Sequence, residues 1–199
     1  MARPPILLAS ASPRRSALLR QIDVDHDVRP VDIDEAPRTG ERPAQYALRL
    51  AEEKARALWQ RLEPTERRPV LAADTTVALG LEILGKPLDR DDAARILARL
   101  SGREHEVHTA VALLHEGGAD ARVSTSTVTF RELTEAEIEW YWRTGEPADK
   151  AGAYAVQGHG AIFIRHLAGS YSGVMGLPLY ETWELLAPLL GLNGREGAA

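Results

Sequence analysis

Short apolar runs alternate with longer amphipathic stretches along this chain, and the alternation predicts strands interleaved with helices. Buried strands are expected at Ile6–Ala9, at Val70–Ala73 with Asp74 at its end, at Val77–Leu84 and at Ile162–His166. Apolar residues at alternate positions over 106–115 and 122–131 predict two longer strands. Gly117 and Gly118 lie between them and favour an antiparallel hairpin.

Helices are expected where apolar residues recur at helical spacing between a capping residue and a stop signal. The first begins at Ser12 and Pro13, an N-cap followed by proline at the first helical position, and runs to about Ile22. The others are expected at 43–62, 89–102, 135–143 and 177–190. Strands and helices interleave, and at least one strand pair is antiparallel. We therefore predict the α/β class, with a mixed twisted sheet and flanking helices.

The composition limits the classes of protein to consider. A chain of 199 residues with 44% hydrophobic residues can bury a sizeable core, and we expect one domain over 1–199, with its core at about 6–190 and a disordered tail at 193–199. The net charge of −5 argues against a non-specific nucleic-acid binder but leaves room for a small anionic ligand. The absence of cysteine excludes disulfides and thiolate nucleophiles. Without a membrane-length apolar run or a secretory signal, a cytoplasmic protein is expected.

Lysine is rare here: of 24 lysines and arginines only three are lysine, namely Lys54, Lys86 and Lys150. A lysine is a compact point charge that fits beside one phosphate or carboxylate oxygen, whereas arginine is a wide planar fork. Lys54 falls on the apolar stripe of the helix at 43–62, where it needs a partner charge or must extend to the surface. Lys86 stands between Gly85 and Pro87 on a rigid turn. The role of Lys150 stays open.

The segment ASASPRR joins the first strand to the first helix. Free backbone N–H groups at the start of such a helix make a ready anion site. Arg14 and Arg15 oppose the helix dipole in this first turn, which is easier to understand if an anion lies in front of them. Ordinary capping with two solvated arginines is an equally good interpretation of this segment alone.

Asp74 follows an apolar run, at a position where α/β proteins often place catalytic or metal-binding groups. It could be a general base or an oxygen ligand for a hard cation, and an Asx-turn is the plain alternative. Further along, four glycines around Lys150, Tyr154 and Gln157 indicate a backbone that approaches something closely. Tyr154 could stack on a planar ring and Gln157 could hydrogen-bond it, although both could be ordinary loop residues. The histidines predict no metal site, because His105 and His108 fall on opposite faces of a strand.

The segments ASASPRR, DIDE, EEKA, AADTTV, GKP and DKAGAYAVQG, in this order, resemble the Maf family of nucleotide pyrophosphatases. The resemblance extends from about Ile6 to Leu190. It implies a fold similar to that of the inosine-triphosphate pyrophosphatases, a mixed α/β structure with a deep cleft that is often dimeric. It also implies hydrolysis of a nucleoside triphosphate to the monophosphate and pyrophosphate with a divalent cation, Mg²⁺ or Mn²⁺.

The resemblance assigns roles residue by residue. Phosphate-binding positions of the family match Ser10, Ser12, Arg14, Arg15, Lys54 and Lys86. The family's catalytic aspartate matches Asp74, which is expected to share the metal with Glu35. Positions linked to substrate choice match Arg14, Thr75 and Gln157, and they resemble the branch that hydrolyses dTTP and UTP. The family often has valine where this chain has Thr76, a nearly isosteric change.

Two other functions stay open at this point. The enzyme could act on a modified purine nucleotide such as 7-methyl-GTP. Alternatively, the cleft could bind a nucleotide as a signal in a non-catalytic regulator of septum formation, a hypothesis that the complete set of acids and lysines makes weaker. We expect a homodimer with a nucleoside triphosphate as ligand and with neither nucleic acid nor membrane as partner.

Overall fold

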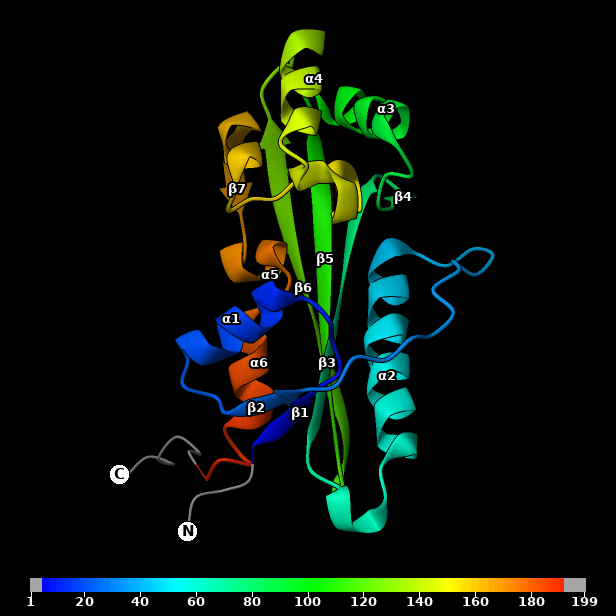
Figure 1. The fold of residues 1–199 in the computed structure, drawn as a ribbon, viewed down its shortest axis with the longest axis vertical. Coiled ribbons are helices and arrows are strands. Elements are labelled where there is room, and N and C mark those ends of the chain that lie inside the picture. Colours follow the sequence, from blue (N-terminus) through cyan, green and yellow to red (C-terminus); the bar gives the residue numbers. More distant parts are fainter. Residues whose placement is uncertain (1–4, 192–199) are drawn as a thin grey trace, which may run out of the picture.

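Three long strands form the centre of the molecule: β3 (Val70–Leu79), β5 (Glu104–His115) and β6 (Gly118–Phe130). They are antiparallel neighbours and run along most of the long axis of this computed structural model, which describes residues 5–191 (Figure 1). Four short strands complete the sheet: β1 (Ile6–Leu8), β2 (His26–Val28), β4 (Glu82–Leu84) and β7 (Ile164–Ala168). The order is β2-β1-β3-β5-β6-β7, with β4 paired to β3 beyond this path.

Helices pack on the sheet in two groups. Around the lower half of Figure 1 lie α1 (Pro13–Gln21), α2 (Pro43–Arg61) and α6 (Leu179–Leu186), with the short α5 (Tyr171–Met175) at mid-height. The upper half holds α3 (Arg90–Leu100) and α4 (Glu135–Arg143), followed by 3₁₀ turns at Glu146–Asp149, Ala151–Ala153 and His159–Phe163. A further 3₁₀ turn, Pro64–Glu66, follows α2. We call these halves the lower and upper lobes. No helix within residues 5–191 is both long and apolar enough to cross a membrane.

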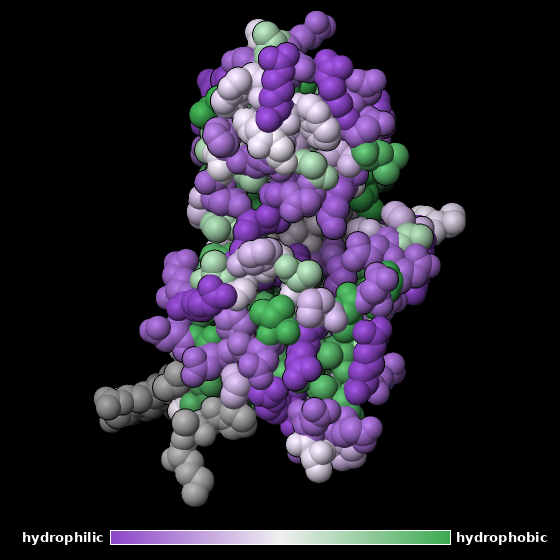
Figure 2. Space-filling model, viewed as in Figure 1, coloured by the Kyte–Doolittle hydropathy of each residue, from purple (hydrophilic) through white to green (hydrophobic). Residues whose placement is uncertain are grey.

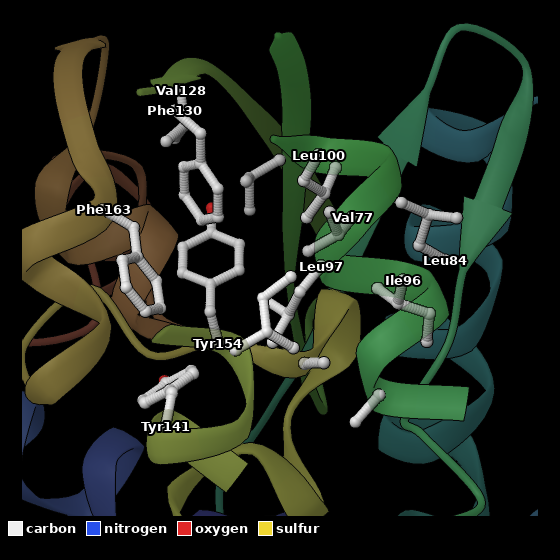
Figure 3. Packing of buried hydrophobic residues seen from close by; sticks show 14 residues of the cluster. Val77, Leu84, Ile96, Leu97, Leu100, Val128, Phe130, Tyr141, Tyr154 and Phe163 are labelled. Atoms are coloured by element: carbon white, nitrogen blue, oxygen red, sulfur yellow. The ribbon is translucent and has the colours of Figure 1, made fainter. Parts of the chain in front are cut away.

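The core divides in the same way, because alternate strand residues face opposite sides of the sheet. In the lower lobe, Val70 and Ala72 of β3 pack against the small residues of α2, whereas Leu71 and Ala73 pack against α1 and α6. The upper lobe has its own cluster, built from β4, α3, α4 and the upper ends of the long strands (Figure 3).

Aromatic rings dominate the upper cluster. Phe130 meets Tyr154 edge-on with ring centres 4.8 Å apart, and Tyr141 meets Phe163 edge-on at 5.0 Å. Such pairs are worth about 0.5–1.5 kcal/mol beyond the area that they bury. The cluster therefore holds the glycine-rich segment (residues 145–160), which carries Tyr154, firmly against the sheet (Figure 3).

The outer edge of β3 is covered at both ends but not in the middle. Strand β1 pairs with Val70 and Leu71 in parallel, and β4 pairs with Val77 to Leu79 in antiparallel fashion. Between these contacts, residues 72–76 have strand partners only in β5. Neither short strand pairs with this stretch, and Asp74, Thr75 and Thr76 from it line the space between the two lobes.

The predicted elements are largely confirmed. The hairpin of β5 and β6, the helices at 43–61, 90–100 and 135–143, and the first strand and helix all form close to their expected bounds. Asp89 caps α3 by accepting a hydrogen bond from the backbone of Asp92, and Gly102 ends that segment at φ 67°. Ser12 stands at the N-cap of α1 as expected, but its side chain makes no capping hydrogen bond. The α/β class with a mixed sheet and flanking helices is confirmed.

Other boundaries were wrong. The expected strand 70–73 does not end at Asp74 but continues to Leu79, and the expected strand 77–84 is divided by a turn at Gly80 and Leu81. Pairing with β5 along nine residues explains this continuity, which no local signal shows. The late strand lies at 164–168 rather than 162–166, and the last helix is shorter than expected. Strand β2 and helix α5 were not predicted. The expected tail at 193–199 lies outside the described residues.

Candidate active site

A cleft of about 470 Å³ lies between the lobes, in front of the middle of β3. In Figure 2 the surface where the two lobes meet is mostly hydrophilic. Every site residue expected from the sequence lines the cleft: Ser10, Ser12, Arg14, Arg15, Glu35, Lys54, Asp74, Thr75, Lys86 and Gln157. The fold thus brings together ten residues from six separate segments of the chain.

Lys54 joins two carboxylates on one wall of the cleft. Its Nζ lies 2.7 Å from Asp74 Oδ1 and 2.6 Å from Glu35 Oε1. The side chains of Lys54 and Asp74 are only 12% and 10% exposed, whereas that of Glu35 is 48% exposed. The second oxygen of Asp74 accepts a longer hydrogen bond, 3.3 Å, from the Thr76 hydroxyl. The sequence prediction of a partner charge for Lys54 is therefore confirmed, and Asp74 forms no Asx-turn because it lies inside a strand.

Glu35 belongs to the loop between β2 and α2, and two residues of α2 hold this loop. Tyr46 donates its hydroxyl to the backbone oxygen of Glu35 at 2.7 Å, and Arg49 donates to that of Ala36 at 3.2 Å. Burial raises the pKa of Glu35, but the hydrogen bond from Lys54 and the nearby cationic charges outweigh burial and hold this pKa below its usual value. Glu35 is therefore ionised at neutral pH.

The two arginines of α1 differ in their contacts. Arg15 donates to the backbone oxygen of Gly176 at 2.7 Å, to the Ser10 hydroxyl at 3.0 Å and to the Thr75 hydroxyl at 3.3 Å. Burial lowers the pKa of the Arg15 guanidinium, against the opposing effect of Asp74. Arg14 makes one hydrogen bond among the described residues, from Nε to the oxygen of Met175 at 3.3 Å. Among the described residues its terminal nitrogens make no hydrogen bond to the protein, whereas those of Arg15 do.

Lys86 enters the cleft from the upper lobe. Within residues 5–191 its ammonium group has no ion-pair partner. The turn that carries it is tied to the glycine-rich segment, since Gly152 N–H donates to the oxygen of Gly85 at 3.0 Å. Gly152 has φ 68°, and a Cβ there would lie 2.8 Å from a methyl group of Val77. The expected close approach of a glycine backbone is confirmed at this contact.

The glycine-rich segment forms the far side of the cleft. Gln157 is exposed and lines the cleft, but Tyr154 is buried and its hydroxyl meets His105 Nε2 at 2.9 Å. Tyr154 is therefore a core residue rather than a free stacking platform. Lys150 also lines the cleft and is paired with its neighbour Asp149.

Sequence reasoning missed three groups at this site. Tyr46 lines the cleft, and burial, aided by the charges of Asp74 and Glu35, raises its pKa to about 12. The backbone oxygens of Met175 and Gly176, at the end of α5, fix the two arginines. Thr109 of β5 donates to the oxygen of Gly173 and so attaches α5 to the sheet. Tyr46 stands two turns before Lys54 on α2, and that spacing was the one available signal.

The donor set fits a small hard cation. The carboxylates of Glu35 and Asp74 both contact the Lys54 ammonium group, so they supply oxygen atoms to the same part of the cleft. Mg²⁺ and Mn²⁺ prefer oxygen ligands, and Mg²⁺ is often held by one or two carboxylates together with phosphate oxygens and water. Among residues 5–191, no three His, Asp or Glu side chains form a complete metal site by themselves. Two protein carboxylates completed by a phosphate ligand therefore suit this cleft.

Comparisons with known proteins show what this chain is similar to. The family model described as Maf-like protein matches residues 5–189. A dTTP/UTP pyrophosphatase of Pseudoalteromonas atlantica is 50% identical over 183 residues, with 92% of this chain and 95% of that protein covered. One of Alkalilimnicola ehrlichii is 52% identical, with 92% of each chain covered. The solved structure of the Staphylococcus aureus Ham1 protein aligns with a TM-score of 0.47 at 15% identity, over 94% of this chain and 98% of that one.

Proposed function

This chain belongs to the Maf family, and on that basis we propose that it hydrolyses dTTP and UTP to the monophosphate and pyrophosphate. Relatives that bear this name are about 50% identical over nearly the whole length of both chains. The residues that the family resemblance singled out all line a single cleft. The convergence of Lys54, Glu35 and Asp74 on the wall of the cleft is the observation that carries the proposal.

The triphosphate would lie between the lobes. Arg14 at the start of α1 and Lys86 on the opposite side have donors without protein partners among the described residues, so both can bind phosphate oxygens. Ser10 and Ser12 stand at the start of α1, where free backbone N–H groups favour an anion. Arg15 supports this binding site, because its hydrogen bonds hold Ser10 and Thr75 in place.

A divalent cation would be held by Glu35 and Asp74 and would neutralise charge on the phosphates. Asp74 is proposed to accept the proton of the attacking water as the water oxygen bonds to phosphorus and the α–β phosphoanhydride bond breaks. Lys54 keeps Asp74 in place through its 2.7 Å contact. Because the site lies in a cleft and not on an open surface, these charges act more strongly than they would in bulk water.

Base selection would fall to the upper lobe. The Gln157 amide offers an N–H₂ donor group and a carbonyl acceptor, which suits the carbonyl and N–H edge of uracil or thymine. Thr75 and Arg14 lie on the other side of the cleft and are proposed to fix the nucleotide relative to Gln157. We expect a cytoplasmic homodimer, and sedimentation or light scattering of the purified protein measures the oligomeric state.

A substrate panel tests the proposal. Pyrophosphate release is measured with dTTP, UTP, CTP and 7-methyl-GTP, each with Mg²⁺ or Mn²⁺ and with excess chelator. We expect dTTP and UTP to be preferred and the chelator to abolish turnover. Preference for 7-methyl-GTP would instead indicate an enzyme that acts on modified purine nucleotides. Absence of turnover with every nucleotide, despite nucleotide binding, would support the regulator instead.

A further inference from the structure

Glu146 lies outside the cleft, yet its carboxylate organises the segment that carries Gln157. Oε1 accepts a hydrogen bond from the Tyr141 hydroxyl at 2.6 Å and another from Gly160 N–H at 3.0 Å. Oε2 accepts from His159 N–H at 2.9 Å and contacts His159 Nδ1 at 3.2 Å. The Glu146 side chain is 16% exposed, so these contacts are largely shielded from water.

The other end of the segment is tied to the same pair. Ala155 N–H donates to the Tyr141 hydroxyl at 3.1 Å, and this hydroxyl in turn donates to Glu146. Residues 155–160 are therefore held at both ends by one tyrosine and one carboxylate. Gln157 lies between the two ends and is exposed to the cleft.

Glycine is required where the segment crosses the carboxylate. A Cβ at Gly158 would lie 2.0 Å from Glu146 Oε2, and one at Gly160 would lie 2.7 Å from the Tyr141 hydroxyl. Real Cβ contacts are never this short, so the backbone lies directly on these polar atoms. Contact with Glu146 and Tyr141 therefore explains why glycine is required at Gly158 and Gly160, which the cleft by itself does not explain.

Tyr141 supplies a rigid base for this arrangement. Its ring is completely buried and meets Phe163 edge-on at 5.0 Å (Figure 3). Burial raises the pKa of Glu146, but hydrogen bonds from Tyr141, Gly160 and His159 outweigh burial and hold this pKa below its usual value. The carboxylate is consequently an ionised acceptor at neutral pH, and charge-assisted hydrogen bonds of this kind are the stronger class.

We propose that Glu146 is a positioning residue for base recognition: with Tyr141 it fixes residues 155–160 so that the Gln157 amide faces the pyrimidine of the substrate. This role rests on the proposed function, because it presumes that Gln157 reads a base. A fixed amide loses little conformational freedom on binding, so preorganisation of the segment favours nucleotide binding rather than the chemical step.

The variant Glu146→Gln tests this role. The amide has similar shape but turns an N–H₂ group toward backbone N–H donors, so the segment loses part of its anchor. We expect kcat/KM for UTP to fall about tenfold, mostly through a higher KM, and the preference for UTP over CTP to fall with it. Backbone amides of residues 155–160 should exchange hydrogen faster. The variant Tyr141→Phe, which loses only the hydroxyl, should shift KM and exchange in the same direction if Glu146→Gln proves unstable.

Glu139→Gln is the matched control, since Glu139 forms surface ion pairs from the same region without contacting the segment. It should leave KM and exchange unchanged. If Glu146 only stabilises the fold, Glu146→Gln should have a lower melting temperature while its KM and UTP preference stay within twofold of wild type. That result would overturn the positioning role alone. A wild-type protein that releases no pyrophosphate from UTP or dTTP overturns the proposed function itself.

Discussion

The Lys54 ammonium group lies 2.7 Å from the Asp74 carboxylate, so that helix α2 and strand β3 meet in an ion pair on the wall of the cleft. Both side chains are nearly buried, and a buried charge is tolerated only when it is paired. The pair therefore links the stability of the lower lobe to the chemistry of the site.

Replacement of Asp74 by asparagine should abolish catalysis without unfolding the protein. Asparagine keeps the shape of the side chain, and Lys54 keeps Glu35 as a partner, but the amide cannot accept the proton of water. Loss of a general base lowers kcat by roughly a hundredfold to ten-thousandfold. Pyrophosphate release and circular dichroism measure the two effects. Asp91→Asn, at a side chain that is 92% exposed on α3, is the control, and full activity of Asp74→Asn would exclude the mechanism.

Removal of Lys54 should cost stability as well as activity. In Lys54→Ala the Asp74 carboxylate stays buried without its ion-pair partner, which destabilises the fold by about 3 kcal/mol. Lys54→Arg should not restore activity, because a planar fork does not fit the point between the two carboxylates. Urea unfolding gives the stability, and an unchanged midpoint for Lys54→Ala would contradict this account of the ion pair.

Replacement of Lys86 should reduce activity with little loss of stability. Its side chain lies at the exposed rim of the cleft, so Lys86→Ala changes the free energy of unfolding by no more than about 0.5 kcal/mol. Activity should nevertheless fall at least tenfold, about the effect of one lost charge-assisted hydrogen bond to phosphate. Kinetics and urea unfolding of the same sample measure both. A variant with normal kcat/KM would remove Lys86 from the binding site.

Kinetics and urea unfolding should also distinguish the roles of Arg14 and Arg15. Arg15→Ala removes three hydrogen bonds to the protein and should lower the free energy of unfolding by about 2 kcal/mol. Arg14→Ala should mainly raise KM for the triphosphate, since Arg14 makes one long hydrogen bond to the protein. Equal loss of stability in the two variants would show that both arginines are structural.

His105 should make the stability depend on pH. Burial lowers its pKa to about 4, whereas the unfolded value is about 6.5, so the unfolded chain binds the extra proton first. Stability from this residue is fully present above pH 6.5 and falls by about 1.4 kcal/mol per pH unit toward pH 4. Urea unfolding from pH 7 to 4.5 should give a flatter profile for His105→Phe than for wild type. His166→Gln is the control, and equal profiles for His105→Phe and wild type would contradict the burial effect.

Local patterns were enough for most elements and for several site residues. The β5–β6 hairpin and helix α2 follow from alternation and helical spacing over many residues, and the position of Lys54 on the apolar face of α2 follows from the same spacing. The other site residues were named through the family resemblance. Local patterns alone left the roles of Asp74, Arg14 and Gln157 ambiguous. Tyr46 was missed because its one signal, a spacing of two helical turns from Lys54, does not by itself distinguish a site residue from any other residue on that side of the helix.

The amino-acid sequence alone determined the class of fold and the elements with strong periodicity, because these depend on neighbours in the chain, and the family resemblance added the candidate site residues. Only the tertiary structure decided that β3 continues past Asp74, since pairing with β5 supplies the hydrogen bonds. It also decided that the outer edge of β3 is left uncovered at 72–76, that Arg15 binds the protein, and that Glu146 anchors the segment around Gln157. Each of these depends on contacts between residues far apart in the chain, which no local pattern contains.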